Sequence, residues 1–207
     1  EEPNKMLFSI CCVAALMNLL KRQRDAVGLS VFSEKVELHT PERTTTQHHQ
    51  LLLHELEKMW NHQTDQKPTF AVDALHEIEE NIHKRSLVIL FTDMMDNSER
   101  NNELFTALQH LKFNKHEVIL FHVQDYAKEV SFEYSDRPHR FVDLENGDEI
   151  KLSNNSIKKK YFQKKEAFLK EMKLKCAQYK IDLVETDIKD GFHPVLLAYL
   201  MKREKLF

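Results

Sequence analysis

The segment Ser86–Asn97, SLVILFTDMMDN, contains the strongest fold signal in the chain. It includes an unbroken apolar run, Leu87–Phe91, the pattern of a strand buried on both faces of a parallel sheet. Two carboxylates follow, Asp93 almost directly after the run and Asp96 three positions later. Because ligands of such sheets bind outside the carboxyl ends of the strands, Asp93 is expected at the edge of a binding crevice.

The composition is typical of a globular protein. The chain has 207 residues, 42% hydrophobic and 30% charged, which predicts a single domain over residues 1–207. Only three glycines occur, which disfavours a glycine-rich phosphate loop. Three cysteines form neither a disulfide framework nor a zinc pattern, so a reducing, cytoplasmic location is expected. The apolar segment Ile10–Leu20 is shorter than the ~18 residues of a membrane span, so no membrane segment is expected.

Apolar runs and helical periodicity alternate along most of the chain. Helices are expected at 6–22, 47–60, 69–83, 99–113, 153–178 and 194–205. Strands are expected at 27–32, 36–38, 87–92, 118–123 and 181–184. This alternation predicts an α/β fold with a doubly wound, mostly parallel sheet covered by helices on both faces. Segment 129–152 differs, since Asn146–Gly147 between two short runs predicts a small β-hairpin insertion near 130–152.

Several segments together carry a resemblance to a known family. They are, in order, DAVGLSVFSEKV (25–36), PTFAVDAL (68–75), KRSLVILFTDMMDN (84–97), HEVILFHVQD (116–125), FVDLENGDEI (141–150) and the tail YKIDLVETDIKDGFHPVLLAYLMKR (179–203). This set resembles the von Willebrand factor A-like domain of the bacterial family called domain of unknown function 58. The resemblance covers nearly the whole chain. It implies a six-stranded, Rossmann-type three-layer sandwich with a metal-ion-dependent adhesion site at its top.

The resemblance also implies the residues of that site. An Asp-x-Ser-x-Ser loop follows the first strand, a threonine comes from a second loop, and an aspartate ends the fourth strand. By position, Thr69 matches the threonine and Asp93 the aspartate, with Mg²⁺ or Mn²⁺ as the ion. Pro68 stands where the family usually has glycine, and the Asp-x-Ser-x-Ser loop is absent from these 207 residues.

The strand before that loop is missing as well. In this fold it lies between the strands expected at 27–32 and 87–92. Without it, backbone groups of both neighbours would be buried and unpaired, at about 1–3 kcal/mol each. Either residues upstream of Glu1 supply a central strand or another segment fills the gap, and we expect the first.

Each candidate residue also has a structural interpretation. Asp93 could cap the helix that starts near Ser98, and Thr69 could be the N-cap of the helix at 70–83. Asp96 is better explained as an acid at a helix entry than as a residue that adjusts the charge of the site.

A lysine-rich segment is the other polar feature of note. Residues 151–180 hold ten lysines against Glu166 and Glu171, a balance of +8, so with a net charge of −3 the remainder carries −11. Lys158, Lys159 and Lys160 could contact an acidic partner. The simpler interpretation is the solvated face of a long helix, and no nucleic-acid partner is expected.

The histidines and cysteines suggest no catalytic centre. The twelve histidines form no His-Glu-x-x-His motif, and His76 and His83 lie two turns apart. Histidines such as His48 and His49 are therefore expected at the surface or partly packed. Cys11, Cys12 and Cys176 are expected to be small core residues.

Three functions remain open. The first is a non-catalytic protein–protein interaction module, in which the cation grips an acidic side chain of a partner. The resemblance adds a MoxR-type AAA ATPase as an implied partner in the assembly or maturation of other proteins. The second is a Mg²⁺-dependent phosphoryl-transfer enzyme or receiver-like domain with Asp93 as acceptor, although the neighbouring strand ends, Ser33–Glu34 and Gln124–Asp125, offer no well-placed lysine. The third is a metal-free scaffold whose site has decayed.

Overall fold

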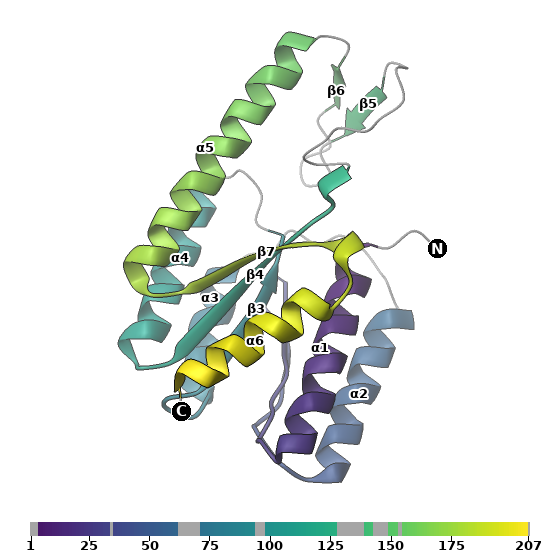
Figure 1. Ribbon diagram of the computed structural model, residues 1–207, viewed down its shortest axis with the longest axis vertical. Coiled ribbons are helices and arrows are strands. Elements are labelled where there is room, and N and C mark those ends of the chain that lie inside the picture. Colours follow the sequence, from purple (N-terminus) through teal and green to yellow (C-terminus); the bar gives the residue numbers. More distant parts are fainter. Residues whose placement is uncertain are drawn as a thin grey trace.

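The protein is an α/β structure built around a parallel sheet, as its computed structural model shows (Figure 1). The structure describes residues 4–33, 35–61, 71–93, 98–127, 139–142, 149–152 and 155–206. Its main sheet has three strands in the order β3 (Leu87–Thr92), β4 (Glu117–Gln124), β7 (Asp182–Asp187). All three run parallel, so the predicted α/β class is confirmed.

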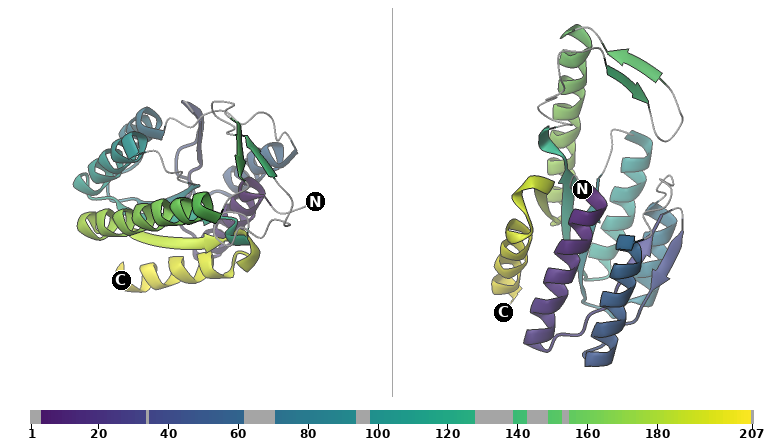
Figure 2. Two further views of the ribbon diagram at one scale, coloured as in Figure 1. Left: turned by 90° about the horizontal axis from the view of Figure 1, so that it is seen from above. Right: turned by 90° about the vertical axis from the view of Figure 1, so that its right-hand side faces the viewer.

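Helices cover both faces of this sheet (Figures 1 and 2). One face packs against α3 (Ala71–Asn81), α4 (Ser98–Phe113) and α5 (Asn155–Tyr179). The other packs against α1 (Lys5–Gln23) and α6 (His193–Leu206). Alternation of side chains along β4 explains the arrangement, because Val118 and Leu120 join the first cluster while Ile119 and Phe121 join the second. All four are at most 1% exposed.

The remaining elements flank this core. Helix α2 (Thr46–Asn61) packs on α1, with Leu52 and Leu56 buried in the contact. Two antiparallel hairpins are separate from the main sheet: β1 (Ser30–Phe32) with β2 (Val36–His39), and β5 (His139–Val142) with β6 (Glu149–Leu152). A short 3₁₀ helix, Ile188–Asp190, precedes α6. The second hairpin confirms the predicted insertion, although Asn146–Gly147 lies outside the described residues.

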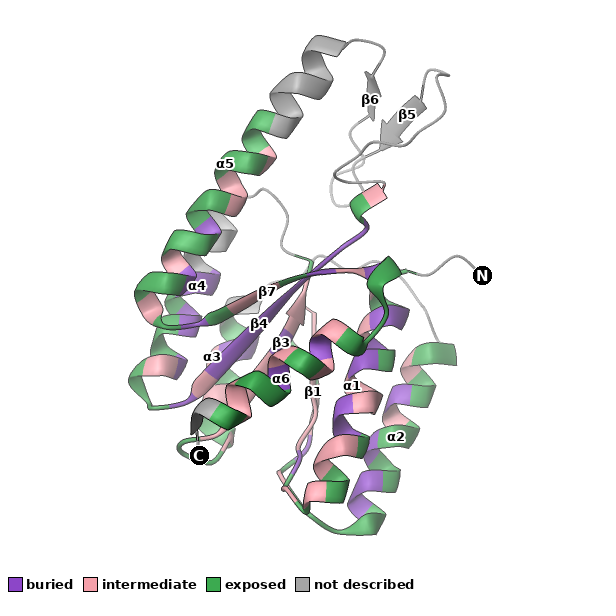
Figure 3. Cartoon of the chain, viewed as in Figure 1, coloured by how far each residue is buried: buried purple, intermediate pink, exposed green. Residues whose placement is uncertain are grey.

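The main sheet has fewer strands than the resemblance implies. Six strands were expected in one sheet, whereas the described residues form one sheet of three and two hairpins. Among those residues, β3 pairs only with β4, and β1 pairs only with β2. The apolar strand β3 is consequently only partly buried, in contrast to β4 (Figure 3).

Helix α1 is long and apolar enough to cross a membrane by length and composition. The same test is passed by core helices of globular proteins. Here Phe8, Cys12 and Leu16 of α1 pack into the cluster with β4 and α6. These contacts place α1 against the sheet, and 33% of its apolar window is buried.

Buried thiols and histidines complete the core. Cys12 and Cys176 are buried as predicted, but Cys11 is exposed. Burial raises the pKa of the Cys12 thiol to about 12 and that of Cys176 to about 11, so neither is an activated nucleophile. The expectation of surface or partly packed histidines is wrong for His48 and His49, which are 7% and 1% exposed.

These two histidines differ in their hydrogen bonds. The His48 ring lies 2.9 Å from the Val27 carbonyl oxygen through Nε2, which explains how a polar ring is tolerated there. The Nε2 atom of His49 has no hydrogen-bond partner among the described residues. Burial, and then the charges of Lys21 and His48, lower the pKa of His49. The folded state therefore favours the neutral His49 ring.

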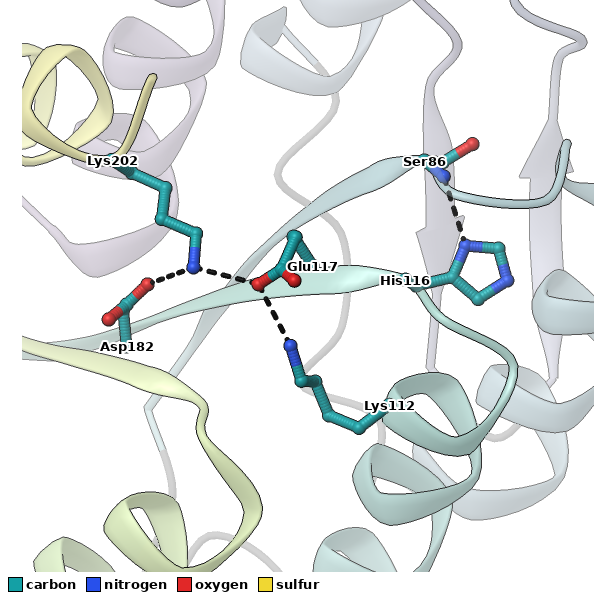
Figure 4. Close-up of polar contacts among 6 residues, drawn as sticks. All are labelled: Ser86, Lys112, His116, Glu117, Asp182 and Lys202. Carbon is teal, nitrogen blue, oxygen red and sulfur yellow. Dashed lines mark hydrogen bonds and ion pairs between the residues drawn. The ribbon is translucent and has the colours of Figure 1, made fainter. Parts of the chain in front are cut away.

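An ion-pair network ties the amino edge of the sheet to the helices (Figure 4). Glu117 Oε2 accepts hydrogen bonds from Lys112 Nζ and Lys202 Nζ, both at 2.8 Å. Lys202 Nζ also lies 2.7 Å from Asp182 Oδ2, so α4, α6, β4 and β7 meet at this point. Burial alone would raise the pKa of Glu117, but the hydrogen bonds from the two lysines outweigh it and hold the pKa below its ordinary value.

We expect Glu117→Gln to lower the free energy of unfolding by about 1–2 kcal/mol at neutral pH, because two ammonium groups lose their shared carboxylate. Since the pKa of Glu117 is lower in the folded state, this stabilisation is present above the ordinary value of 4.5 and is lost as pH falls through the folded pKa. Urea unfolding at several pH values measures both effects. Glu57→Gln, in an exposed pair with His54, is the control and should change stability by less than about 0.5 kcal/mol. Equal effects of both variants would contradict the prediction.

Lowering the pH should destabilise the protein, because His49 is protonated more readily in the unfolded state. Its folded pKa lies below the ordinary value of 6.5, so the unfolded state binds more protons and stability is lost as pH falls below that value. We expect His49→Leu to reduce the drop in melting temperature between about pH 7.5 and pH 5.5. His54→Leu, at an exposed position of the same helix, should leave that drop unchanged. A drop of the same size in the parent and in His49→Leu would refute this role of His49.

Candidate functional site at the carboxyl edge of the sheet

The carboxyl ends of the three parallel strands bring polar residues to one edge. Asp93 follows β3, Gln124 ends β4 and Asp125 follows it, and Thr186 and Asp187 end β7. In the register of the sheet, Thr92 pairs with His122, and Gln124 pairs with Asp187. This edge is where parallel α/β sheets bind ligands.

Asp93 is the exposed carboxylate of this edge. Its side chain is 58% exposed, and Oδ2 lies 3.5 Å from Lys5 Nζ. Lys5 is the first residue of α1, and the side chain of Asn4 caps that helix by accepting a hydrogen bond from the Leu7 N–H at 2.7 Å. Asp93 therefore lies beside a lysine at the amino-terminal end of α1, where the helix dipole also favours a negative group.

The end of β4 is polar but buried. His122, Gln124 and Asp125 are 2%, 5% and 8% exposed. Gln124 Nε2 lies 2.8 Å from His122 Nδ1, and the His122 ring meets Phe168 of α5 edge to face. His122 is thus packed under α5, Gln124 contacts its ring, and all three side chains are buried.

The end of β7 has a structural role. Asp187 Oδ1 accepts hydrogen bonds from the Lys189 N–H at 3.1 Å and the Tyr126 N–H at 3.4 Å. The first bond caps the 3₁₀ helix before α6, and the second ties it to the chain leaving β4. Asp187 thereby fixes the loops on one side of the edge.

The other predicted site residues are placed only in part. Thr69 and Asp96 lie outside the described residues. Lys158, Lys159 and Lys160 fall on α5, but their side chains are outside the described part. Of the predicted metal ligands, the structure thus places Asp93 alone, at the expected edge and exposed to solvent.

The described residues do not by themselves make a Mg²⁺ site. Such an ion takes oxygen ligands in octahedral geometry, commonly one or two carboxylates with waters. Asp93 supplies one carboxylate, which already faces the Lys5 ammonium group. Among the described histidines, cysteines and acids, Asp93 belongs to no group of three with converging ligand atoms.

Sequence reasoning missed Lys5 and Asp187. Asp187 could have been found, because Thr186–Asp187 at the end of β7 repeats the Thr92–Asp93 pair at the end of β3. Lys5 carries no local signal, since its contact with Asp93 spans 88 positions and depends on how α1 packs.

The fold and this edge define an α/β protein with a parallel sheet, helices on both faces and an acidic residue exposed at the carboxyl edge. The family model described as "Protein of unknown function DUF58" matches residues 2–170, and the chain belongs to this family. No curated protein and no solved structure matches the chain.

Asp93 should be dispensable for folding. Its ion pair with Lys5 is solvent-exposed, and such pairs contribute about 0–1 kcal/mol. We expect Asp93→Ala to change the free energy of unfolding by less than about 0.5 kcal/mol in urea titrations at moderate salt. A loss of several kcal/mol would show that the carboxylate has a structural partner and is not a free ligand.

Proposed function

We propose that the protein is a non-catalytic protein–protein interaction module whose binding surface is the carboxyl edge around Asp93. The observation that carries the proposal is the exposure of Asp93 beside the amino-terminal end of α1, at the same edge as the buried end of β4. A carboxylate that contributes little to folding is available for an external ligand. Membership of the DUF58 family agrees with this proposal but does not specify a function.

A von Willebrand factor A-like arrangement is part of the proposal. It requires a strand between β1 and β3. Support comes from β3, an apolar strand that has one strand partner among the described residues and is only partly buried, and from β1, whose described pairing is with β2 alone. Strand edges of this apolar kind are normally covered. The loop after this proposed strand would supply further metal ligands beside Asp93 and Thr69.

In this arrangement Mg²⁺ or Mn²⁺ would join Asp93 to an acidic side chain of the partner. The ion neutralises two sets of oxygens that would otherwise repel each other. A MoxR-type AAA ATPase as partner rests on the family resemblance alone, and a cytoplasmic location rests on the cysteine usage.

One observation favours the phosphoryl-transfer alternative. Gln124 and Asp125 at the end of β4 supply no lysine, but α1 brings Lys5 Nζ to 3.5 Å from Asp93 Oδ2. A lysine beside an acceptor aspartate would stabilise a phosphoryl group through its charge. Incubation with acetyl phosphate and Mg²⁺, followed by intact-mass measurement, tests this reaction. A phosphoryl adduct lost in Asp93→Ala would replace the interaction module by a receiver-like domain.

The metal-dependent function predicts saturable binding of Mg²⁺ or Mn²⁺ in calorimetric titrations of the protein. Asp93→Ala should abolish this binding without loss of fold, because it removes a ligand oxygen from an exposed position. Glu57→Ala, also an exposed carboxylate, is the matched control and should bind like the parent. Absence of binding in the parent would leave the metal-free scaffold as the better description.

A further inference from the structure

Two histidines and a glutamate converge where α3 packs against α4. The ligand atoms of His76, Glu79 and His110 all lie within 4.8 Å of one another. From this convergence we infer that the three side chains form a binding site for one Zn²⁺ ion. The site is independent of Asp93, since it lies near the end of α4 that leads into the amino end of β4.

The sequence and the packing together produce this convergence. His76 and Glu79 are three positions apart on α3 and therefore share a face of that helix. Leu75 of α3 and Leu111 of α4, the sequence neighbours of His76 and His110, are buried in the same core cluster. Packing of these leucines holds the two helices together and leaves the polar side chains at the rim of the contact.

The distances suit a site that needs only side-chain rotation to close. His76 Nδ1 lies 3.7 Å from Glu79 Oε2, and the His76 and His110 rings meet edge to face with centroids 5.1 Å apart. Two ligand atoms of a tetrahedral zinc ion are about 3.3 Å apart. The first pair is already close to that separation, and His110 would have to move inward by about 1–1.5 Å.

The donor set selects zinc over magnesium. Two imidazole nitrogens and one carboxylate oxygen are a known three-ligand set of zinc, with water in the fourth position. Mg²⁺ prefers oxygen ligands only. His76 is 40% exposed and His110 is exposed, so the ion can enter and its fourth position would face solvent.

Glu79 has the features of an oriented ligand. Its side chain is only 8% exposed, and its Oε1 accepts a hydrogen bond from the Asn114 side chain. Outer partners of this kind hold a ligating carboxylate in one orientation.

The chain contains a matched pair for comparison. His54 and Glu57 on α2 have the same spacing and the same 3.7 Å distance between Nδ1 and Oε2. Among the described residues no third ligand joins them. The described helices α2 and α3 thus each carry a histidine and a glutamate at this spacing, and the pair on α3 has His110 opposite it.

The experiment uses protein without a histidine tag and titrates Zn²⁺ in competition with a chromophoric chelator. We expect one equivalent bound, a higher melting temperature with Zn²⁺, and a visible absorption band of tetrahedral Co²⁺ when cobalt replaces zinc. His76→Ala and His110→Ala should weaken binding at least about tenfold and remove the thermal shift. Both positions are partly or fully exposed, so the variants should fold, which melting without metal verifies.

His54→Ala and Asp93→Ala are the controls and should bind zinc like the parent. Failure of the parent to bind one equivalent would overturn the inference. An equal loss of zinc affinity in His54→Ala and His76→Ala would also overturn it, because zinc would then be binding exposed histidines nonspecifically. Neither result bears on Mg²⁺ binding at Asp93, so the two proposals fail or succeed separately.

Discussion

The structure depends on the burial of β4 between two strands and two helical layers. Val118, Ile119, Leu120 and Phe121 are at most 1% exposed, and their alternation divides the core into two clusters. Parallel pairing with β3 and β7 then forces all three carboxyl ends to one edge and all three amino ends to the other. The two ends of the molecule acquire different chemistry from this one constraint.

Much of the fold follows from the sequence, because continuous apolar strands have a strong signal. The predicted bounds of β3 agree with the structure, since Leu87–Thr92 is apolar almost throughout. The predicted last strand stops too early, at Val184. Glu185, Thr186 and Asp187 are polar, but they pair with His122, Val123 and Gln124 of the buried strand, and pairing outweighs local composition there.

The candidate sites also contain some residues that the sequence predicts and others that it does not. Asp93 could be predicted because its position depends only on the strand that precedes it. Lys5 and His110 could not, since each meets its partner through helix packing that no local pattern encodes. His48 and His49 were misjudged for a related reason, because the face of α2 that carries them is covered by neighbouring elements and the Val27 carbonyl lies within hydrogen-bond distance of the His48 ring.

The charged residues at the two edges of the sheet differ in how many structural contacts they make. At the amino edge, Glu117 joins Lys112 and Lys202, which tie two helices to two strands. At the carboxyl edge, Asp93 makes one exposed ion pair whose loss costs little. A side chain that lies on a rigid element and contributes little to stability can bind a ligand without unfolding the scaffold. That difference is the physical reason to test the carboxyl edge for the proposed interaction, and the α3–α4 contact near the opposite edge for the proposed zinc ion.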